Sequence, residues 1–545
     1  MSTATTVATE MLNVQIDGVW LQFPKGTRVI EACTQAQKFV PRYCYHPKLS
    51  APGNCRMCLI EMGMPKMGPD RKPVLGADGR PEINWIPRPQ ISCAQDIAEG
   101  MAVRTESPMV KECRESVMEF LLINHPLDCP ICDQAGECRL QEFSVEYGKA
   151  ESHFLEHKVK KPKNVELGPR VTLDAERCIL CTRCIRFMKE VANDDVLGIV
   201  DRGSFNTIAC HPDRTLESNY SLNTVDICPV GALTSSDFRF KMRVWFLKET
   251  KSIDVNDGLG CNIVIGAREN TIYRITPREN NEVNGVWMPD SHRLNFKYLA
   301  DEQRLVAPKV HHEPAAWPAA ISSAVERLQK HAGSGAIAMV ASAQMTNEEL
   351  FLAKRLAVSL GIEKVDVVPR VGEPDGILIP ADRNPNTSGA KLLGVTGSEP
   401  GSKLAGIAAG IKDGTIKAVI AFEDLVECGL EPTDLIKLEA LVTVGILPNR
   451  STPYATVVLP GAGFAEKRGS MININGRLQR LNKAVEAPGE ARDDWEILRD
   501  LNLAVNGTNG IHFVEDVFRQ MASEVPAMSG LNLGKIGDLG VQLTF

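Results

Sequence analysis

The sequence has no apolar run of about 18 or more residues, the length that a membrane-spanning helix would need. Basic residues are the minority, 61 against 68 acidic ones, and the net charge of -7 gives no support to binding of nucleic acid or of an anionic membrane surface. Residues 1–14 lack the cationic start and apolar stretch of a signal peptide, and the arginines of a transit peptide. These absences predict a cytoplasmic protein that meets a membrane only through its partners.

Motifs for nucleotide binding and nucleophilic catalysis are also missing. The chain has no glycine-rich dinucleotide loop and no Walker motif, and its His, Ser and Asp residues form no recognisable nucleophilic arrangement. Cysteine is scarce only in the second half: of 16 cysteines, just Cys261 and Cys428 lie beyond residue 240. Cysteines of a cytoplasmic protein stay reduced, so those of the first half are candidate ligands rather than a disulfide framework.

The first third of the chain has the pattern of a small sheet domain. Residues 12–23 alternate apolar and polar side chains around the Asp-Gly pair at Asp17, which predicts a β-hairpin. Residues 28–37 have helical spacing. Residues 61–92 are rich in proline and glycine and are expected to form an irregular excursion. The basic run at residues 157–163 is interpreted as a solvated linker rather than a recognition patch.

Beyond about residue 240 the pattern changes to alternating strands and helices. Residues 336–343 predict a buried strand, and a helix follows with a capping box at Thr346 and Glu349 and a closing glycine. Further runs typical of strands are KVDVV, IKAVIAF, LVTVGI and ATVVLP. This alternation predicts an open α/β sheet.

The first cysteine group has the spacing of a binuclear iron-sulfur site. Cys44, Cys55 and Cys58 form a C-x10-C-x2-C pattern, and Cys93 is available 35 residues later. Thiolates are soft, charged donors suited to ferric iron and sulfide, and three from one loop plus one remote thiolate are typical of a [2Fe-2S] centre beside a small sheet. The alternative is an all-cysteine zinc site, but zinc ribbons usually have two C-x2-C pairs and this group has one.

The second group places a histidine before three cysteines. His125, Cys129, Cys132 and Cys138 follow the pattern H-x3-C-x2-C-x5-C, and a helix predicted over residues 109–125 would present the histidine. This spacing suits a [4Fe-4S] cluster, whose potential a neutral imidazole ligand would raise. A zinc site with the same four donors remains the alternative, and a lone histidine is more often a capping or core residue.

The third group is the most specific. Cys178, Cys181 and Cys184 form the C-x2-C-x2-C run of bacterial ferredoxins, and Cys228, which precedes a proline, completes a [4Fe-4S] site most simply. Cys210 could compete as the remote ligand.

Other cysteines have smaller roles in this interpretation. Cys33 and Cys113 lie at helical positions and are expected to be small core residues. Cys261 stands alone and cannot hold a cluster without three companions.

Three redox centres without a place for substrate chemistry indicate an electron carrier.

Three stretches carry a family resemblance. PRYCYHPKLSAPGNCRMC, CPICDQAGECRLQ and RCILCTRCIRF resemble, in that order, the signatures of the large iron-sulfur subunit of respiratory complex I, the 75 kDa subunit family. The resemblance implies an α+β and α/β multidomain fold. Its expected parts are an N-terminal β-grasp [2Fe-2S] ferredoxin-like domain (1–105), a His/Cys and ferredoxin-like domain with two [4Fe-4S] clusters (106–240), a small molybdopterin-oxidoreductase-type domain without its cluster (241–300) and a shortened molybdopterin-oxidoreductase-like α/β scaffold (301–545).

The resemblance also implies a role and a set of partners. It makes His125 a ligand and implies that electrons pass from NADH through a flavin subunit to the binuclear centre, then to the Cys178 and His125 clusters, and on to a ferredoxin-like subunit and quinone. The chain would make no bond itself, and would lie with other peripheral-arm subunits at the cytoplasmic side of the inner membrane.

The sequence departs from the family in three places. The Cys58 to Cys93 interval is long and is expected to form a surface contact with a neighbour, and the lone Cys261 implies that the additional cubane of some bacterial relatives is absent. The short C-terminal region lacks a persuasive cysteine for molybdenum, so no molybdopterin is expected. The alternatives are a formate dehydrogenase-like enzyme, a multi-cluster hydrogenase, the diaphorase subunit of a soluble hydrogenase, and a non-enzymatic zinc-binding module.

Overall fold

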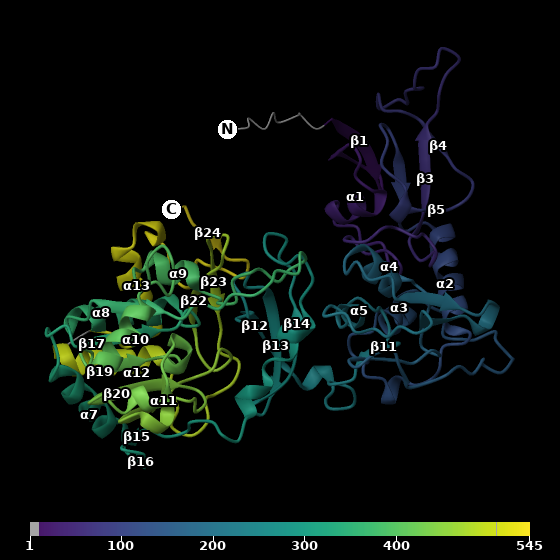
Figure 1. Cartoon of the computed structure of the whole chain (residues 1–545). Helices are drawn as coiled ribbons and strands as arrows, with labels where there is room; N and C mark the ends of the chain where they lie inside the picture. The colour runs from purple at the N-terminus through teal and green to yellow at the C-terminus, as the bar shows by residue number, and fades with distance from the viewer. Residues whose placement is uncertain (1–9, 508–509, 545) are drawn as a thin grey trace. The chain divides into compact units, whose positions relative to one another are not determined.

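A computed structural model describes residues 10–507 and 510–544, which form two compact units. The first unit ends at Trp245 and the second begins at Phe246 (Figure 1). Within the described residues, no helix combines the length and the apolar character that crossing a membrane requires. Most of the segment without signal-peptide character, residues 1–9, lies outside the described part.

A sheet with the order β2-β1-β6-β3-β4 begins the first unit, and β5 pairs with β3. The bounds are β1 Met11–Ile16, β2 Val19–Pro24, β3 Leu59–Pro65, β4 Ile83–Trp85, β5 Gln90–Ile91 and β6 Ala102–Arg104. The predicted hairpin is confirmed: β1 and β2 are antiparallel, and Asp17 and Gly18 at the turn both have positive φ, 48° and 87°. Helix α1 (Val29–Gln35), also predicted, buries Val29 and Ile30 in the core of this sheet.

The expected irregular excursion over residues 61–92 is only partly irregular, because strands occur at both of its ends. Strand β3 extends into this range, and β4 and β5 lie inside it. Backbone pairs also connect the rest, with Lys66 N–H donating to the Glu82 carbonyl (2.7 Å) and Val74 N–H to the Lys66 carbonyl (2.8 Å). Pro69 and Gly79 lie at turns, whereas Gly63 and Pro65 lie within β3, and Pro73 and Pro81 form isolated β-bridges.

Helix α2 (Pro108–Leu122) ends before His125, so the predicted helix over residues 109–125 is three residues too long. The end has a physical cause, because Lys158 Nζ donates to the carbonyls of Leu122 (2.9 Å) and Ile123 (2.8 Å) at the negative end of the helix dipole. The histidine therefore stands on the loop after the helix.

The basic run at residues 157–163 has no regular secondary structure and none of its residues is buried, as expected of a solvated linker, but several of its lysines are held by partners, which refines the sequence interpretation. Besides the cap that Lys158 provides, Lys161 Nζ donates to the Asn206 carbonyl (2.7 Å). Lys163 forms ion pairs with Asp128 (2.6 Å) and Glu176 (2.8 Å). Its lysines connect segments of the first unit.

The rest of the first unit consists of short elements joined by long loops. A three-stranded sheet has the order β11-β8-β7, and β9 pairs with β10. The bounds are α3 Arg139–Tyr147, β7 Val165–Glu166, β8 Val171–Leu173, α4 Arg183–Glu190, β9 Leu197–Val200, β10 Thr207–Cys210, α5 Asn223–Asp226 and β11 Leu233–Ser235.

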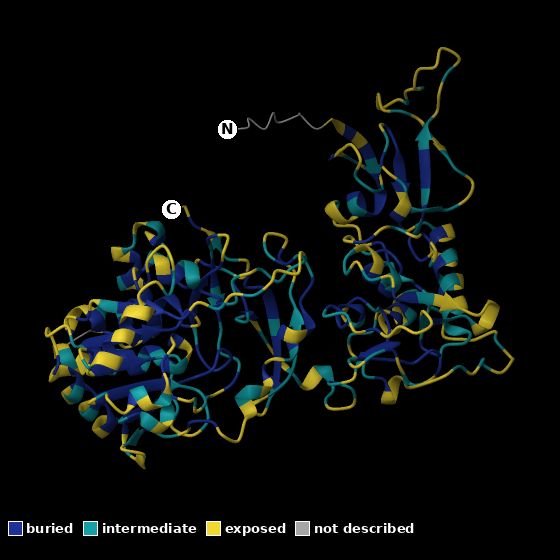
Figure 2. Cartoon of the chain, in the orientation of Figure 1, coloured by how far each residue is buried: buried dark blue, intermediate teal, exposed yellow. Residues whose placement is uncertain are grey.

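The second unit is built on a seven-stranded sheet with the order β16-β15-β21-β20-β19-β17-β18. Its strands are β15 Lys309–Val310, β16 Glu313–Pro314, β17 Ile337–Ala341, β18 Lys364–Val367, β19 Ala418–Ala421, β20 Ala440–Gly445 and β21 Val457–Pro460. From β21 to β18 the strands are parallel, so the open α/β sheet is confirmed. The central strands are buried (Figure 2).

Helices surround this sheet. They are α7 Trp317–Gln329, α8 Asn347–Ser359, α9 Thr387–Leu392, α10 Leu404–Asp413, α11 Pro432–Leu435, α12 Asp494–Asn506 and α13 Val514–Glu524. The predicted capping box is present at the start of α8, where Thr346 and Glu349 exchange hydrogen bonds.

Two small sheets complete the second unit. One has the order β12-β13-β14, with β12 Lys248–Ile253, β13 Asn262–Arg268, β14 Thr271–Pro277 and the short helix α6 Asp290–Leu294 after it. The other has the order β22-β23-β24, with β22 Gly469–Ile472, β23 Arg477–Leu481 and β24 Val541–Gln542.

Candidate metal centres

Sheet pairing brings the first cysteine group together. Cys58 directly precedes β3, and one residue, Ser92, separates Cys93 from the end of β5. Because β3 and β5 are antiparallel, with Leu59 opposite Ile91, these two cysteines are neighbours. Ser92 Oγ reinforces the junction by donating to the Cys58 carbonyl at 2.8 Å.

The four thiols of this group interact directly. Hydrogen bonds with the thiols of Cys55 and Cys93 lower the pKa of Cys44, and a hydrogen bond with Cys93 lowers the pKa of Cys58 to about 7. Backbone N–H groups of Asn54 and Cys55 also donate to the Cys44 sulfur. Such donors stabilise a thiolate and, in a cluster site, tune its potential.

The third group surrounds a buried site at the start of α4. Cys178, Cys181 and Cys184 lie on the loop and the first turn of this helix, and each is close enough to the Cys228 thiol to have its pKa affected by it. Burial is the larger cause and raises the pKa of all four thiols. Donors face the sulfurs here too, with Leu180 N–H 3.4 Å from Cys178 Sγ.

The structure places the competing Cys210 elsewhere. It lies at the end of β10, and its Sγ contacts the Leu167 carbonyl at 3.3 Å. The charges that influence its pKa are those of Arg214 and Asp194, and no cysteine is among them.

The second group lies on the loops between α2 and α3. Cys129 and Cys132 bound a short 3-10 turn, and Cys138 is the residue before α3. His125 is half-buried, and burial lowers its pKa to about 4, which keeps the imidazole neutral and able to bind a metal. Arg177 lies within electrostatic reach of both His125 and Cys132.

A loop from the third group also contacts the second. Cys138 Sγ lies 3.9 Å from the carbonyl of Pro229, the residue after Cys228. Two residues further on, a Cβ at Gly231 would lie 2.2 Å from Cys132 Sγ, so only glycine allows this approach. The two sites therefore adjoin along one short segment.

Arginines of α4 connect the third group to the first. Arg183 donates to the carbonyls of Ile227 (3.1 Å) and Tyr45 (2.6 Å), which precede Cys228 and follow Cys44. Arg186 donates to the Cys44 carbonyl at 2.5 Å. The charge of Arg183 reaches thiols of both groups, those of Cys44, Cys55, Cys181 and Cys228.

Sequence reasoning missed these arginines and the buried Arg177, which pairs with Asp128 at 2.9 Å and Asp174 at 3.2 Å. The available signal was an arginine directly before a ligand twice in the third motif, at Arg177 before Cys178 and at Arg183 before Cys184. As for the other cysteines, Cys33 is buried in α1 as expected, whereas Cys113 on α2 is partly exposed.

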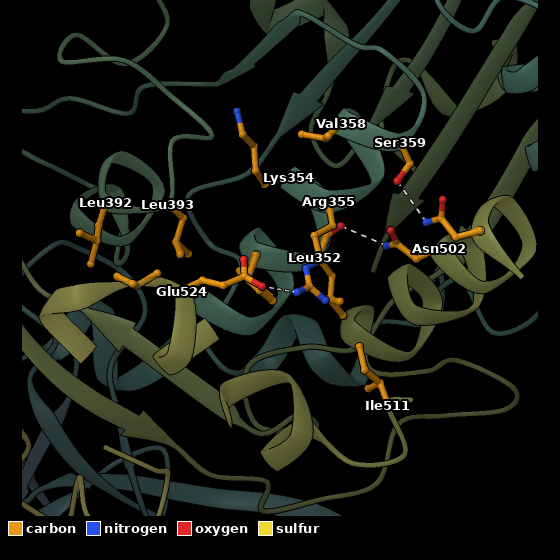
Figure 3. Close-up of a pocket in the computed structure, with 13 residues that line it drawn as sticks. Leu352, Lys354, Arg355, Val358, Ser359, Leu392, Leu393, Asn502, Ile511 and Glu524 are labelled. Atoms are coloured by element: carbon orange, nitrogen blue, oxygen red, sulfur yellow. Dashed lines mark hydrogen bonds and ion pairs between the residues drawn. The ribbon is translucent and has the colours of Figure 1, made fainter. Parts of the chain in front are cut away.

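The second unit has clefts but no comparable group of cysteines within its described residues. One cleft of about 630 Å³ lies beside α8, where Arg355 forms an ion pair with Glu524 (Figure 3). Another of about 380 Å³ lies where strands β17, β19 and β20 end, the usual ligand position of an α/β sheet. Its cations are already paired, Arg370 with Glu423 (2.6 Å) and Lys467 with Asp494 (3.1 Å).

Cysteines arranged in three adjoining groups, on a sheet domain and ferredoxin-like loops, define an iron-sulfur electron-transfer protein. Family models match along the chain in the same order. Residues 9–108 match a 2Fe-2S iron-sulfur cluster binding domain, 114–153 the NADH-ubiquinone oxidoreductase-G iron-sulfur binding region, 168–234 the ferredoxin-like domain of NADH-quinone oxidoreductase subunit 3, 247–297 an NDSU1/NuoG-like 4Fe-4S domain and 367–503 molybdopterin oxidoreductase.

Curated relatives cover most of the chain. The G subunit of NADH-quinone oxidoreductase from Rickettsia conorii is 30% identical over 96% of this chain and 92% of its own length. The mitochondrial NADH-ubiquinone oxidoreductase 78 kDa subunit of Neurospora crassa is 32% identical over 96% and 84%. The G subunit from Rickettsia felis is 40% identical over 66% of this chain, a match that spans 50% of that relative.

The chain belongs to the family of the NADH-quinone oxidoreductase G subunit. It is an electron-transfer subunit of complex I, as the motifs predicted, and the predicted fold class is confirmed. Among solved structures, a chain of the NAD+-reducing [NiFe]-hydrogenase in the H2-reduced state matches 43% of this chain and 91% of its own, at 25% identity with a TM-score of 0.35.

Proposed function

We propose that twelve residues hold one [2Fe-2S] and two [4Fe-4S] clusters, which supply one-electron transfer when bound. The ligands are Cys44, Cys55, Cys58 and Cys93 for the binuclear cluster, His125, Cys129, Cys132 and Cys138 for one cubane, and Cys178, Cys181, Cys184 and Cys228 for the other. The mutual influence of the thiols within each group, and the backbone N–H groups that donate to Cys44, Cys178 and Cys228, support these sets.

The spacing of the donors favours clusters over zinc. Tetrahedral zinc with bonds of about 2.3 Å to sulfur would hold its sulfurs about 3.8 Å apart. In the described part of the chain, no three of the twelve ligand residues have their donor atoms all within 4.8 Å of one another. This disfavours a compact zinc site and supports the proposal of clusters, whose own sulfides lie between the ligands.

The observation that carries the proposed function is the order of the contacts. The Cys44 loop touches α4 through Arg183 and Arg186, so the binuclear site adjoins the Cys178 site. The segment after Cys228 in turn touches Cys132 and Cys138 of the His125 site. We infer the order Cys44 site, Cys178 site, His125 site for the electron path.

The ends of this path follow from the family. The curated relatives are named as subunits of NADH-quinone and NADH-ubiquinone oxidoreductases. We therefore propose a flavin subunit that oxidises NADH as the donor, and a ferredoxin-like subunit on the way to quinone as the acceptor. The chain makes no bond itself and lies with other peripheral-arm subunits at the cytoplasmic side of the inner membrane.

A molybdopterin is not expected in the second unit, although residues 367–503 match the molybdopterin oxidoreductase model. The cleft at the strand ends is lined by four carboxylates, Glu423, Asp424, Glu427 and Asp494, which oppose an anionic, phosphate-bearing cofactor. Because Arg370 and Lys467 are already neutralised by ion pairs, the cleft offers a phosphate little attraction.

Metal analysis of the anaerobically purified full-length chain tests the proposal. One binuclear and two cubane clusters require about ten irons per chain, with no molybdenum. Molybdenum together with iron would indicate a formate dehydrogenase-like enzyme. Zinc in place of iron in a colourless protein would overturn the redox assignment.

A further inference from the structure

Three buried side chains meet in the second unit, away from the cysteine groups. Asp254 follows β12, Asp257 lies in the turn before β13, and His292 is on α6. All three are buried, and their donor atoms lie within 4.8 Å of one another. Within the described residues this is the single group of three His, Cys, Asp or Glu side chains so compact.

Each carboxylate accepts a backbone hydrogen bond with one oxygen and directs its other oxygen toward the His292 imidazole. Asp254 Oδ1 accepts from the Asn256 backbone N–H (3.2 Å), while its Oδ2 lies 2.7 Å from His292 Nδ1. Asp257 Oδ1 accepts from the Leu259 backbone N–H (2.9 Å), and its Oδ2 faces the same imidazole nitrogen at 3.7 Å. Such outer contacts are what orient metal-binding carboxylates.

One oxygen at this centre has no hydrogen-bond donor in the described structure. Asp257 is fully buried, and its Oδ2 is without a hydrogen-bond partner. Leaving a carboxylate oxygen unsatisfied away from water costs free energy, so a buried case calls for a bound group that the protein itself does not provide. A second carboxylate beside it, that of Asp254, makes a cation the natural choice.

The separations are also close to those that a metal ion would set. Donor atoms at about 2.0–2.1 Å from one ion lie roughly 2.8–3.4 Å apart in octahedral or tetrahedral arrangements. The observed separations of 2.7 and 3.7 Å from His292 Nδ1 bracket that range. One imidazole with two carboxylates suits a divalent transition metal, since magnesium and calcium prefer sites made of oxygen alone.

We propose that Asp254, Asp257 and His292 bind one divalent transition-metal ion of the Zn2+ class, which fixes helix α6 to the turn between β12 and β13. The site differs from an iron-sulfur centre in its donors. Residues 247–297 match a 4Fe-4S domain model, yet Cys261 is the one cysteine in that range, so four thiolates are not available there. The inference does not depend on the ligand sets proposed for the first unit.

The test compares the full-length chain with Asp257→Asn, which keeps the size of the side chain and removes its charge. After gel filtration in chelator-free buffer, which removes loosely bound ions, zinc, manganese and iron are counted per chain by mass spectrometry. We expect the wild type to retain one more ion than the variant in total. Asp413→Asn, which changes an exposed carboxylate, is the matched control and should retain the wild-type number.

A second readout is independent of retention during purification. Added Zn2+ should raise the unfolding temperature of the EDTA-treated wild type by several degrees, and that of the Asp257→Asn protein much less. His292→Gln should behave like Asp257→Asn. Both variants could instead hold as many ions as the wild type and show the same change in unfolding temperature with Zn2+. In that case the proposed metal site is wrong, and the three residues form a hydrogen-bonded cluster that includes a proton.

Discussion

Arg183 donates a hydrogen bond of 2.6 Å to the carbonyl oxygen of Tyr45, across 138 positions of the chain. The arginine directly precedes one proposed cubane ligand, Cys184, and the tyrosine directly follows a binuclear ligand, Cys44. A cation thus stands between two neighbouring centres. Its positive charge favours the more negative, reduced state of each.

The first prediction concerns this charge. Arg183→Gln should lower the reduction potentials of both the binuclear and the Cys178 clusters, by an amount on the order of tens of millivolts, because a nearby positive charge is lost. Redox titration followed by electron paramagnetic resonance measures both. Arg519→Gln, which changes an exposed arginine paired with Asp516 in the second unit, is the control. If both reduction potentials are unchanged in Arg183→Gln, the arginine only connects the two loops and does not tune the clusters.

The remote ligand of the Cys178 site gives the second prediction. Cys228→Ala should remove the signal of this cubane and lower the iron content, because one of its four donors is gone. Cys210→Ala is the matched control, since this cysteine bonds to the Leu167 carbonyl instead and should keep the signal. The reverse pattern would transfer the ligand role to Cys210.

The third prediction uses a close approach of the backbone. A methyl group in Gly231→Ala would lie 2.2 Å from Cys132 Sγ and must displace the sulfur or the loop. We expect the His125 cubane to be lost, with about four fewer irons per chain, while the binuclear signal persists. Gly397→Ala is the control, because nothing lies within 4 Å of its added carbon. Full iron content in Gly231→Ala would contradict the proposed ligand role of Cys132.

The candidate ligands could be predicted from sequence because cluster loops use closely spaced cysteines. Short-range signals were equally informative elsewhere, as in the hairpin at Asp17 and the capping box of Thr346 with Glu349. What local spacing could not show were contacts between distant segments. The bond from Arg183 to Tyr45 and the meeting of Asp254 with His292 depend on how the loops pack.

The same limit explains the errors. Helix α2 was predicted to reach residue 125 because its apolar spacing continues, but Lys158, more than 30 positions away, caps it at Leu122. The basic run at residues 157–163 has the composition of a solvated linker, and its lysines acquire partners only in the folded chain. Composition predicts exposure on average, whereas a particular lysine is placed by its tertiary contacts.

The last prediction tests the histidine ligand. His125 is half-buried with its pKa lowered to about 4, so it is neutral at physiological pH, whereas a thiolate at the same place would be negative. His125→Cys should therefore keep a cluster but lower its potential, because added negative charge disfavours reduction. Redox titration of this cubane measures the change, with the potential of the binuclear cluster as an internal reference. An exposed histidine, His153, pairs with Glu119 at 2.8 Å, so His153→Gln is a control that should leave both potentials as they are. An unchanged potential in His125→Cys would mean that residue 125 is not a ligand and that another group completes the site.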